Sequence, residues 1–395
     1  MIHRIAIIAE WVAGAITVCS MGYYALCLWS AARFLRPAGE TGLSEGGGAA
    51  LPTQTALPVS ILKPVKGTDP EMYESLRSHC LQGFSEYEII FGVSEGSDPA
   101  IPLIERLQLE FPQRTIRLVL CDKNLGANTK VSNLAQMLPE ARHEFILVND
   151  SDIRVPADYL QRVTAPLADA QVGLVTCLYR GVPGRTLGSR LEALGISTDF
   201  SAGVLAARQL EGGIRFGLGS TLAFRRHDLE AIGGFEAFVD YLADDYEIGR
   251  RISEHGLEVK LSEVVVETYL PPYTLREFVD HQLRWGRTVR DSRRWGYLGL
   301  ALTFGFAWAL LALLLSRGAL WAWILLAMSL GLRFAVALLV GRSILDDREL
   351  IPLLPLLPIR DLIATLVWIV SLAGKRVIWR GKSFRLKEGR LTPWD

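Results

Sequence analysis

Long apolar stretches lie near both ends of the chain. The first, residues 11–32, contains 22 residues without a charge and is flanked by arginines. A helix of that length crosses the ~30 Å apolar core of a bilayer, so residues 1–36 are predicted to form an N-terminal transmembrane anchor. Residues 37–57 lose all periodicity and contain three consecutive glycines, which predicts a flexible linker.

Short apolar runs rich in valine and isoleucine are typical of residues 58–294. Five runs have the length of strands, with amphipathic segments between the first four: VSILKPV, YEIIFGV, TIRLVLC, FILVND and VGLVTCLY. Strands that alternate with helices form mostly parallel α/β sheets. Ligands of such sheets bind at the carboxyl ends of the strands, so polar residues there are the first candidates for a site.

A second apolar region occupies residues 295–374. Residues 298–316 carry no charge and residues 318–341 carry only Arg333, so each segment is predicted to cross the membrane. Residues 351–374 contain three prolines and an Arg-Asp pair. This pattern leaves open a third span, a re-entrant hairpin and an interfacial helix.

The distribution of basic residues predicts how the chain is oriented. Residues 375–395 hold seven Lys and Arg against two acidic residues, and more arginines gather over 287–294. Positive charge concentrates on the cytoplasmic side of membrane proteins, so the domain over 58–294 and the basic tail are both predicted to be cytosolic. The amino terminus then lies outside, and the tail stays cytosolic only if residues 351–374 do not fully cross.

Composition narrows the range of partners. The 395 residues include 42 Lys and Arg against 42 Asp and Glu, so the formal charge is zero and no nucleic-acid partner is expected. Half of the residues are hydrophobic, which indicates that part of the apolar surface faces lipid. The five cysteines show no CxxC spacing, so neither a disulfide framework nor a zinc site is expected.

Two pairs of acidic residues are the main candidates for chemistry. Asp150 and Asp152 follow the fourth predicted strand one residue apart, so both side chains can reach one hard divalent cation and a diphosphate bound to it. Asp244 and Asp245 open an amphipathic stretch. Taken alone, the first pair also fits an ordinary turn and the second a helix cap.

A basic amphipathic segment precedes the second apolar region. It contains His281, Arg284 and Trp285, followed by a run of arginines at Arg287, Arg290, Arg293 and Arg294. Such a segment fits a helix that lies at a membrane surface. It also fits a site in which Arg284 neutralises a leaving diphosphate and Trp285 walls an acceptor pocket.

Taken in order, these motifs resemble those of the family 2 and family 21 glycosyltransferases. From about Val59 to Arg294 the chain is most similar to family 21, the ceramide glucosyltransferase family with its bacterial relatives. The matching segments are VSILKPVKG at 59–67, DPA at 98–100, GANTKVSNL at 126–134, DSDIRV at 150–155, ADDY at 243–246 and RW at 284–285. The resemblance implies a GT-A domain, an α/β fold with a mostly parallel sheet, flanked by transmembrane helices.

The resemblance also implies a set of donor-binding residues. Glu95 and Asp98 are expected to bind the uracil and ribose of a UDP-sugar, and the choice between them stays open because this chain reads SEGS where many relatives read DDGS. Lys130 is expected to meet a phosphate or a sugar hydroxyl, unless it is simply an exposed helical lysine. Asp152, with help from Asp150, is expected to hold Mg²⁺ or Mn²⁺ against the diphosphate.

Three residues are expected to carry the transfer step. Asp245 takes the proton of the acceptor hydroxyl as that hydroxyl attacks the anomeric carbon from the opposite face, which inverts its configuration. Arg284 adds positive charge at the leaving group, and Trp285 shapes the acceptor mouth. The family motif (Q/R)xxRW has His281 at its first position here, and the turn over 217–221 resembles the acceptor-side turn of the family or is a plain turn.

The function implied by this resemblance is membrane-bound transfer of a hexose, with glucose as the preferred sugar, from a UDP-sugar to a lipid hydroxyl. Ceramide ranks first as acceptor, and glycosylation of a hopanoid polyol from UDP-N-acetylglucosamine is the alternative. A processive polysaccharide synthase needs a larger set of channel-forming helices, and a non-catalytic scaffold does not need the acidic motifs. Because Arg284 and Trp285 closely precede the segment 298–316, the acceptor mouth is expected at the bilayer surface.

Overall fold

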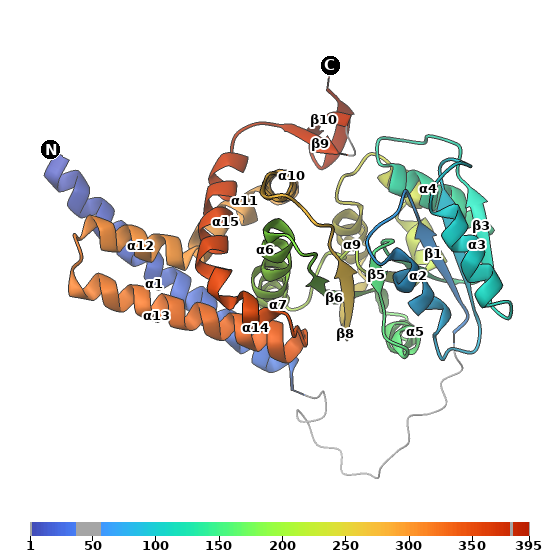
Figure 1. The fold of residues 1–395 in the computed structure, drawn as a ribbon, viewed down its shortest axis with the longest axis horizontal. Helices are drawn as coiled ribbons and strands as arrows, with labels where there is room; N and C mark the ends of the chain where they lie inside the picture. The colour runs from blue at the N-terminus through green and yellow to red at the C-terminus, as the bar shows by residue number, and fades with distance from the viewer. Residues whose placement is uncertain (1, 37–56, 380–381, 395) are drawn as a thin grey trace, which may run out of the picture.

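The computed structural model describes residues 2–36, 57–379 and 382–394. The predicted linker over 37–57 lies outside the described residues except for its last position. In Figure 1 three long helices form one side of the molecule and a sheet covered by helices forms the other.

The five predicted strand segments all form strands of one eight-stranded sheet. Its order is β3-β2-β1-β4-β7-β6-β8-β5. Strands β3, β2, β1 and β4 are parallel to one another, as are β6 and β8, whereas β7 and β5 run antiparallel to their neighbours. The bounds are β1 (Val59–Pro64), β2 (Tyr87–Val93), β3 (Thr115–Leu120), β4 (Phe145–Val148), β5 (Ile153–Arg154), β6 (Val172–Val182), β7 (Leu222–Arg225) and β8 (Glu258–Tyr269).

The central strands are apolar because helices cover both of their faces. Every residue of β1 and β2 is buried, as expected for parallel strands in the middle of an α/β domain. The covering helices are α2 (Met72–Cys80), α3 (Ile101–Glu110), α4 (Thr129–Met137), α5 (Tyr159–Thr164), α6 (Leu187–Gly195), α7 (Ser201–Leu210), α8 (Arg226–Ala231) and α9 (Asp244–Glu254).

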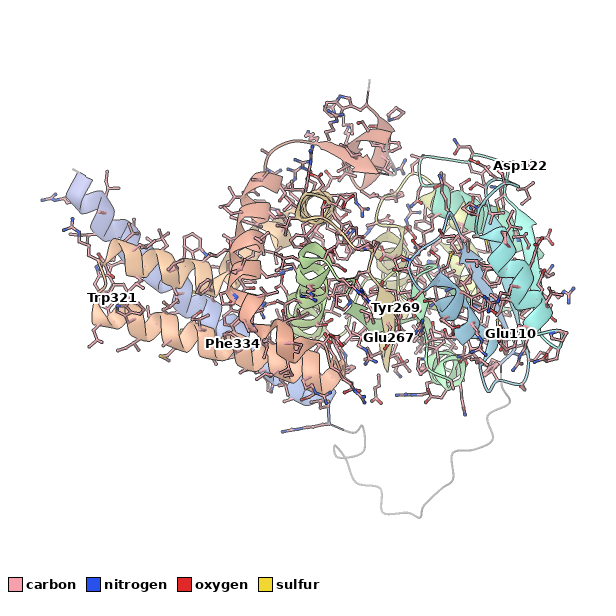
Figure 2. All side chains as sticks on the ribbon, viewed as in Figure 1. Glu110, Asp122, Glu267, Tyr269, Trp321 and Phe334 are labelled. Carbon is pink, nitrogen blue, oxygen red and sulfur yellow. The ribbon has the colours of Figure 1, made fainter. Side chains whose placement is uncertain are left out.

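Strand β8 is the long element that the sequence analysis did not predict. Its sequence, EVKLSEVVVETY, alternates apolar and polar residues, which is the pattern of a half-buried strand. It ends beside Asp152, whose backbone oxygen accepts a hydrogen bond from the Tyr269 amide at 3.2 Å. Figure 2 shows Glu267 and Tyr269 on this strand, in the middle of the molecule.

Three helices pack side by side as a bundle: α1 (Ile2–Phe34), α12 (Gly305–Leu315) and α13 (Leu320–Ala337). The Trp11 and Trp321 rings stack with centroids 5.7 Å apart, at the end of α13 far from the sheet, while Phe334 lies at its near end (Figure 2). Within the part of the chain that the structure describes, three helices are apolar enough by length and composition to cross a membrane: Arg4–Phe34, Leu320–Ile344 and Leu350–Ser371.

The segment predicted as a straight span over 298–316 is bent instead. It consists of the pair Arg294–Thr303 and Gly305–Leu315, which meet at an angle of 54° and which together are also apolar enough to cross. The Tyr24 hydroxyl of α1 donates to the carbonyl of Thr303 at 3.0 Å and accepts from the amide of Gly305 at 3.2 Å. These bonds satisfy backbone groups that the break leaves without helical partners, which makes a bend tolerable in an apolar setting.

The last apolar segment contains α14 (Leu350–Leu353) and α15 (Leu357–Ser371), and α15 runs crosswise to the bundle in Figure 1. It packs beside α10 (Leu275–Ser292), the basic amphipathic helix. The charges inside the apolar segments are paired, because Arg333 of α13 forms two hydrogen bonds to the Asp361 carboxylate at 2.8 and 2.9 Å.

Residues of the predicted basic tail form a second, three-stranded antiparallel sheet, which the sequence analysis did not predict. Its strands are β9 (Arg376–Trp379), β10 (Lys382–Lys387) and β11 (Arg390–Pro393), in the order β11-β10-β9. One face is apolar and packs on the α/β domain, where Phe384, Leu386 and Leu391 contact Ala127 and Leu242. Figure 1 shows this sheet between α10 and α4.

Candidate active site

The first acidic pair lies where β4 ends, as predicted. Asp150 Oδ1 is 2.9 Å from the Lys130 ammonium nitrogen. Asp152 Oδ2 accepts a hydrogen bond from the Thr268 hydroxyl at 2.5 Å. Between them, Ser151 donates to the Asp69 carboxylate at 2.5 Å, so a third acid that the sequence analysis did not select lies at the same turn.

A buried polar network stabilises the turn that carries Asp150 and Asp152. Lys63 of β1 is fully buried and donates to the Asp150 carbonyl at 2.8 Å. His79 of α2 contacts both Lys63, at 3.5 Å, and the Asn149 amide oxygen, at 3.1 Å. Burial lowers the pKa of Lys63 to about 7, and burial together with Lys63 holds the pKa of His79 well below its ordinary value. The sequence signal was a lysine inside the apolar run VSILKPV.

The second acidic pair opens α9 and faces the same lysine. Lys130 lies 3.4 Å from the Asp244 carboxylate, so it bridges Asp150 and Asp244. Its side chain is only 14% exposed, which rules out the alternative of an exposed helical lysine. Although burial disfavours its charge, Asp150 and Asp244 raise the pKa of Lys130 and keep it cationic. Ala243 occupies the N-cap position of α9, and both acids lie in the first turn, where Asp245 Oδ1 accepts a hydrogen bond from the Tyr246 amide at 2.8 Å.

The turn over 217–221 fits between the two acidic pairs. A methyl group added at Gly219 would lie 3.2 Å from Oδ2 of Asp245 and 3.3 Å from Oδ2 of Asp150. Both oxygens therefore lie close to the same point, and they face one shared space. At Gly217, the amide donates to the Asp245 carbonyl at 3.2 Å. Glycine at both positions lets the turn approach the acids closely.

Asp152 and Asp245 both bind protons more tightly than ordinary aspartates. Burial, and the neighbouring charge of Asp150, raise the pKa of Asp152 to about 6. Burial and Asp244 raise the pKa of Asp245 to about 6, although Lys130 opposes the shift. A carboxylate with a pKa near 6 is ionised at neutral pH and is still a better proton acceptor than an ordinary aspartate.

The two acids predicted to bind the nucleoside line a cavity of about 200 Å³ at the ends of β1 and β2. Asp98 stabilises the lining of this cavity. Its carboxylate accepts hydrogen bonds from the amide of Gly67, at 3.0 and 3.1 Å, and from the amide of Ala100, at 2.9 Å. Glu95 is exposed at the rim. The geometry thus gives Asp98 a structural task and leaves Glu95 facing the space.

Helix α10, which carries His281, Arg284 and Trp285, packs against a buried acid. Glu192 of α6 is 2% exposed and accepts a hydrogen bond from the Gln282 amide at 2.8 Å. Its other oxygen is 3.2 Å from His281 Nδ1. His281 therefore contributes to the α6–α10 contact, and Glu192 is a residue that the sequence analysis missed.

A row of aromatic rings leads from α10 towards β6. Tyr273 stacks on His281 with centroids 5.6 Å apart, His281 contacts Trp285 at 5.5 Å, and Trp285 meets Phe200 edge-on at 5.9 Å. Phe200 in turn lies 5.2 Å from Tyr179. Burial, followed by the charges of Asp245 and Glu192, raises the pKa of Tyr179. The row thus connects α10 to the neighbourhood of the acids.

Arg284 lies half-buried on α10 within this row. Its charge acts on Tyr273, where it opposes the effect of burial on the pKa of that phenol. Arg284 and Trp285 are therefore on the element that connects the acidic centre to the apolar helices.

The acids are compatible with a divalent cation. Carboxylate oxygens are the ligands that Mg²⁺ and Mn²⁺ prefer, and the missing side chain at Gly219 leaves room in front of Asp150 and Asp245. Among residues 2–36, 57–379 and 382–394, no group of three or more His, Cys, Asp or Glu side chains is arranged so that it could hold a metal ion by itself. Donor phosphates and water would supply the remaining ligands, as is usual for Mg²⁺.

A mixed sheet with acids at the strand ends, next to an amphipathic helix and apolar helices, defines a GT-A glycosyltransferase domain attached to a membrane region. The model of glycosyl transferase family 21 matches residues 12–392, and the chain belongs to this family. The resemblance and the fold class predicted from the motifs are therefore confirmed.

Individual relatives agree with this assignment. Ceramide glucosyltransferase 3 of Caenorhabditis elegans is 26% identical over 228 residues, 58% of this chain and 49% of that protein. The ceramide glucosyltransferase of Komagataella phaffii is 34% identical over 108 residues, 26% of this chain and 21% of that protein. The chain spans about half the length of the first of these relatives.

The fold also matches a solved structure. The mannosyltransferase PcManGT from Pyrobaculum calidifontis, in complex with GDP-Man and Mn²⁺, has a TM-score of 0.54 and 20% identity, and the match covers 92% of this chain and 100% of that one. At this identity the likeness concerns the fold.

Proposed function

We propose that the protein transfers a hexose, preferably glucose, from a UDP-sugar to the hydroxyl of a membrane lipid, preferably ceramide, with inversion at the anomeric carbon. Membership of family 21 and the ceramide glucosyltransferases among its relatives support this function. The observation that carries it is the convergence of Asp150, Asp244 and Asp245 on Lys130, beside a helix that leads directly into the apolar segments.

Each residue of the centre has a physical task in this reaction. The lipid hydroxyl attacks the anomeric carbon, the bond from that carbon to the UDP oxygen breaks, and the hydroxyl proton moves to Asp245. Lys130 and Arg284 place positive charge near the diphosphate as it leaves with both electrons of the broken bond. Asp152 and Asp150 would hold Mg²⁺ or Mn²⁺, which when bound supplies further positive charge to the leaving group.

The acceptor side has a different composition. Trp285, Phe200 and Tyr179 offer ring faces rather than charges, and such surfaces suit the apolar body of a lipid near its hydroxyl. Because α10 continues towards the helices that can cross a membrane, a lipid would present its headgroup without leaving the bilayer.

The small sheet supports a location of the domain and the C-terminal segment on one side of the membrane, which we take as the cytoplasmic side. It is hydrogen-bonded to the α/β domain, so the two lie on the same side of any membrane, and an even number of crossings must separate them. Two crossings, the bent pair and α13, satisfy this condition if α15 lies along the surface, crosswise to the bundle as in Figure 1. Cysteines introduced at Leu109 and Lys387 should then react with an impermeant reagent from the same side, whereas reaction from opposite sides would contradict this arrangement.

Release of UDP from a UDP-sugar by the purified protein tests the function. Release should require a long-chain lipid with a free hydroxyl and should be far slower with a short, water-soluble analogue that carries the same hydroxyl. A processive synthase would release UDP with no added lipid, and a scaffold would release none. Either outcome would contradict the proposal.

A further inference from the structure

The cavity that Glu95 and Asp98 line adjoins a second cavity. The cavity next to Glu95 and Asp98 holds about 200 Å³, less than the roughly 300–1,000 Å³ of most ligand pockets. A second cavity of about 440 Å³ lies between the C-terminal sheet and the loop over 124–129. Lys66 lines both, so the two cavities meet at this residue.

Polar groups and rings line the second cavity together. The loop contributes Asn124 and Thr129, and the residue after Thr129 is Lys130, the lysine that bridges the acidic pairs. Asp240 also lines the cavity, and its carboxylate accepts a hydrogen bond from the Ala127 amide at 2.9 Å. The C-terminal segment contributes Ser383 beside the rings of Phe384, Pro393 and Trp394. Polar groups together with ring faces fit a nucleoside with attached phosphates.

Backbone hydrogen bonds fix the C-terminal sheet at this place. The Leu391 amide donates to the Asp240 carbonyl at 2.7 Å, and the Leu242 amide donates to the Gly389 carbonyl at 3.1 Å. Residues 240–242 are bonded not only to the sheet but also to the 124–129 loop, since the Asn128 side chain donates to the Tyr241 carbonyl at 2.8 Å. The segment that leads to Asp244 and Asp245 is thus held between the loop and the sheet.

The sheet is also attached to the acceptor-side helix. The Gly389 amide donates to the Asp291 carboxylate at 2.6 Å, and the Arg287 guanidinium donates to the Arg376 carbonyl at 2.8 Å. Both Arg287 and Asp291 belong to α10. The sheet therefore connects the donor side of the site with the helix that carries Arg284 and Trp285.

We propose that the C-terminal three-stranded sheet is part of the donor site: the cavity between it and residues 124–129 receives part of the nucleoside diphosphate, and Trp394 contacts the nucleoside. This inference rests on the proposed function, since it takes a UDP-sugar as the donor. It assigns a binding role to a segment that its charge alone would make a solvated tail.

Protection of two adjacent positions from alkylation tests the contact. Pro393 lines the cavity, whereas Thr392 is exposed and does not line it. In a Cys19→Ser background, because Cys19 is the exposed native cysteine, saturating UDP should slow alkylation of Pro393→Cys about tenfold. Alkylation of Thr392→Cys should change by less than about twofold, because its face remains open to solvent.

Nucleotide affinity provides the second measurement. Trp394→Ala should weaken UDP binding to the full-length protein in detergent about tenfold, the loss typical of an aromatic contact with a base. Ile378→Ala, at an exposed position of the same sheet, should leave UDP affinity unchanged. Equal alkylation of both cysteines with and without bound UDP, or unchanged affinity of the Trp394 variant, would overturn the inference while leaving the proposed function intact. Absence of UDP binding to the parent protein would overturn both.

Discussion

The donor side and the acceptor side of the site are built from different kinds of contact. On the donor side, Asp150, Asp152 and Lys130 are each held by an ion pair or a hydrogen bond of at most 2.9 Å. In the row of rings proposed as the acceptor side, Trp285 and Phe200 meet edge-on with ring centroids 5.9 Å apart and without an ion pair between them. Under the proposed function, the polar side would bind a charged donor and the aromatic side would form an apolar mouth for a lipid.

The largest effect on activity is expected from a substitution of Asp245, the proposed base. Asp245→Asn keeps the shape of the side chain but cannot take a proton, so kcat should fall roughly a thousandfold while UDP-sugar affinity stays within a few-fold. Initial-rate kinetics together with calorimetric titration of UDP would measure both. Turnover above about a tenth of the parent value would remove Asp245 from this role.

A smaller but broader loss is expected at the predicted metal ligand. Asp152→Ala should weaken metal-dependent donor binding and lower activity roughly a hundredfold, because both depend on the same carboxylate. EDTA should have the same effect on the parent protein, and added Mn²⁺ should reverse it. Full activity in EDTA would count against a metal at this site.

The space between the acids can be filled without removing any charge. In Gly219→Ala the new methyl group would lie against Asp245 and Asp150, so activity should fall about tenfold with little change in thermal stability. Gly83→Ala is the matched control, because a methyl group there meets no atom within 4 Å. Equal activity of the two variants would show that this space is not used.

The pH dependence follows from the raised pKa values. Asp245 must be ionised to accept a proton, and its pKa lies at about 6. Activity should therefore be constant at neutral pH and fall as the pH drops through 6, by about tenfold for each further unit. A pH–rate profile that stays flat down to pH 5 would contradict the assignment of this carboxylate as the base.

The smallest effect is expected on the acceptor side. Trp285→Phe preserves an apolar ring but loses area, so KM for the lipid should rise about three- to fivefold with UDP affinity unchanged. Trp295→Phe, at a residue 80% exposed on the next helix, serves as control. A change in UDP affinity in the Trp285 variant would show that the two sides are not separable.

The difference between the polar contacts of the acids and the packing contacts of the aromatic row also explains which parts of the site could be predicted from the sequence. Asp150 and Asp152 lie one residue apart at the end of β4, and Asp244 and Asp245 are adjacent at the start of α9, so both pairs could be recognised in the sequence, as could the strands β1 to β4 and β6. Glu192, Phe200 and Tyr179 come from separate elements and meet only through packing, which leaves no local motif. Lys63 is an exception, because a lysine within an apolar strand is a visible signal.

The C-terminal segment shows why charge alone was misleading. Its seven basic residues identified it only as a basic tail beside the membrane, yet apolar residues alternate with them, and Phe384, Leu386 and Leu391 bury one face of a sheet. Period-2 alternation over so short a segment was hidden by the high charge. The bend between α11 (Arg294–Gly299) and α12 was equally hidden, because it depends on Tyr24 from the far end of the chain.

The most direct test of the account is mass spectrometry of lipids after incubation of the protein in bilayer nanodiscs with UDP-glucose and ceramide. The account predicts a ceramide product heavier by one hexose residue, and no product from the Asp245→Asn variant. Hydrolysis of UDP-glucose without a glycosylated lipid, or glycosylation of a soluble sugar alone, would contradict it.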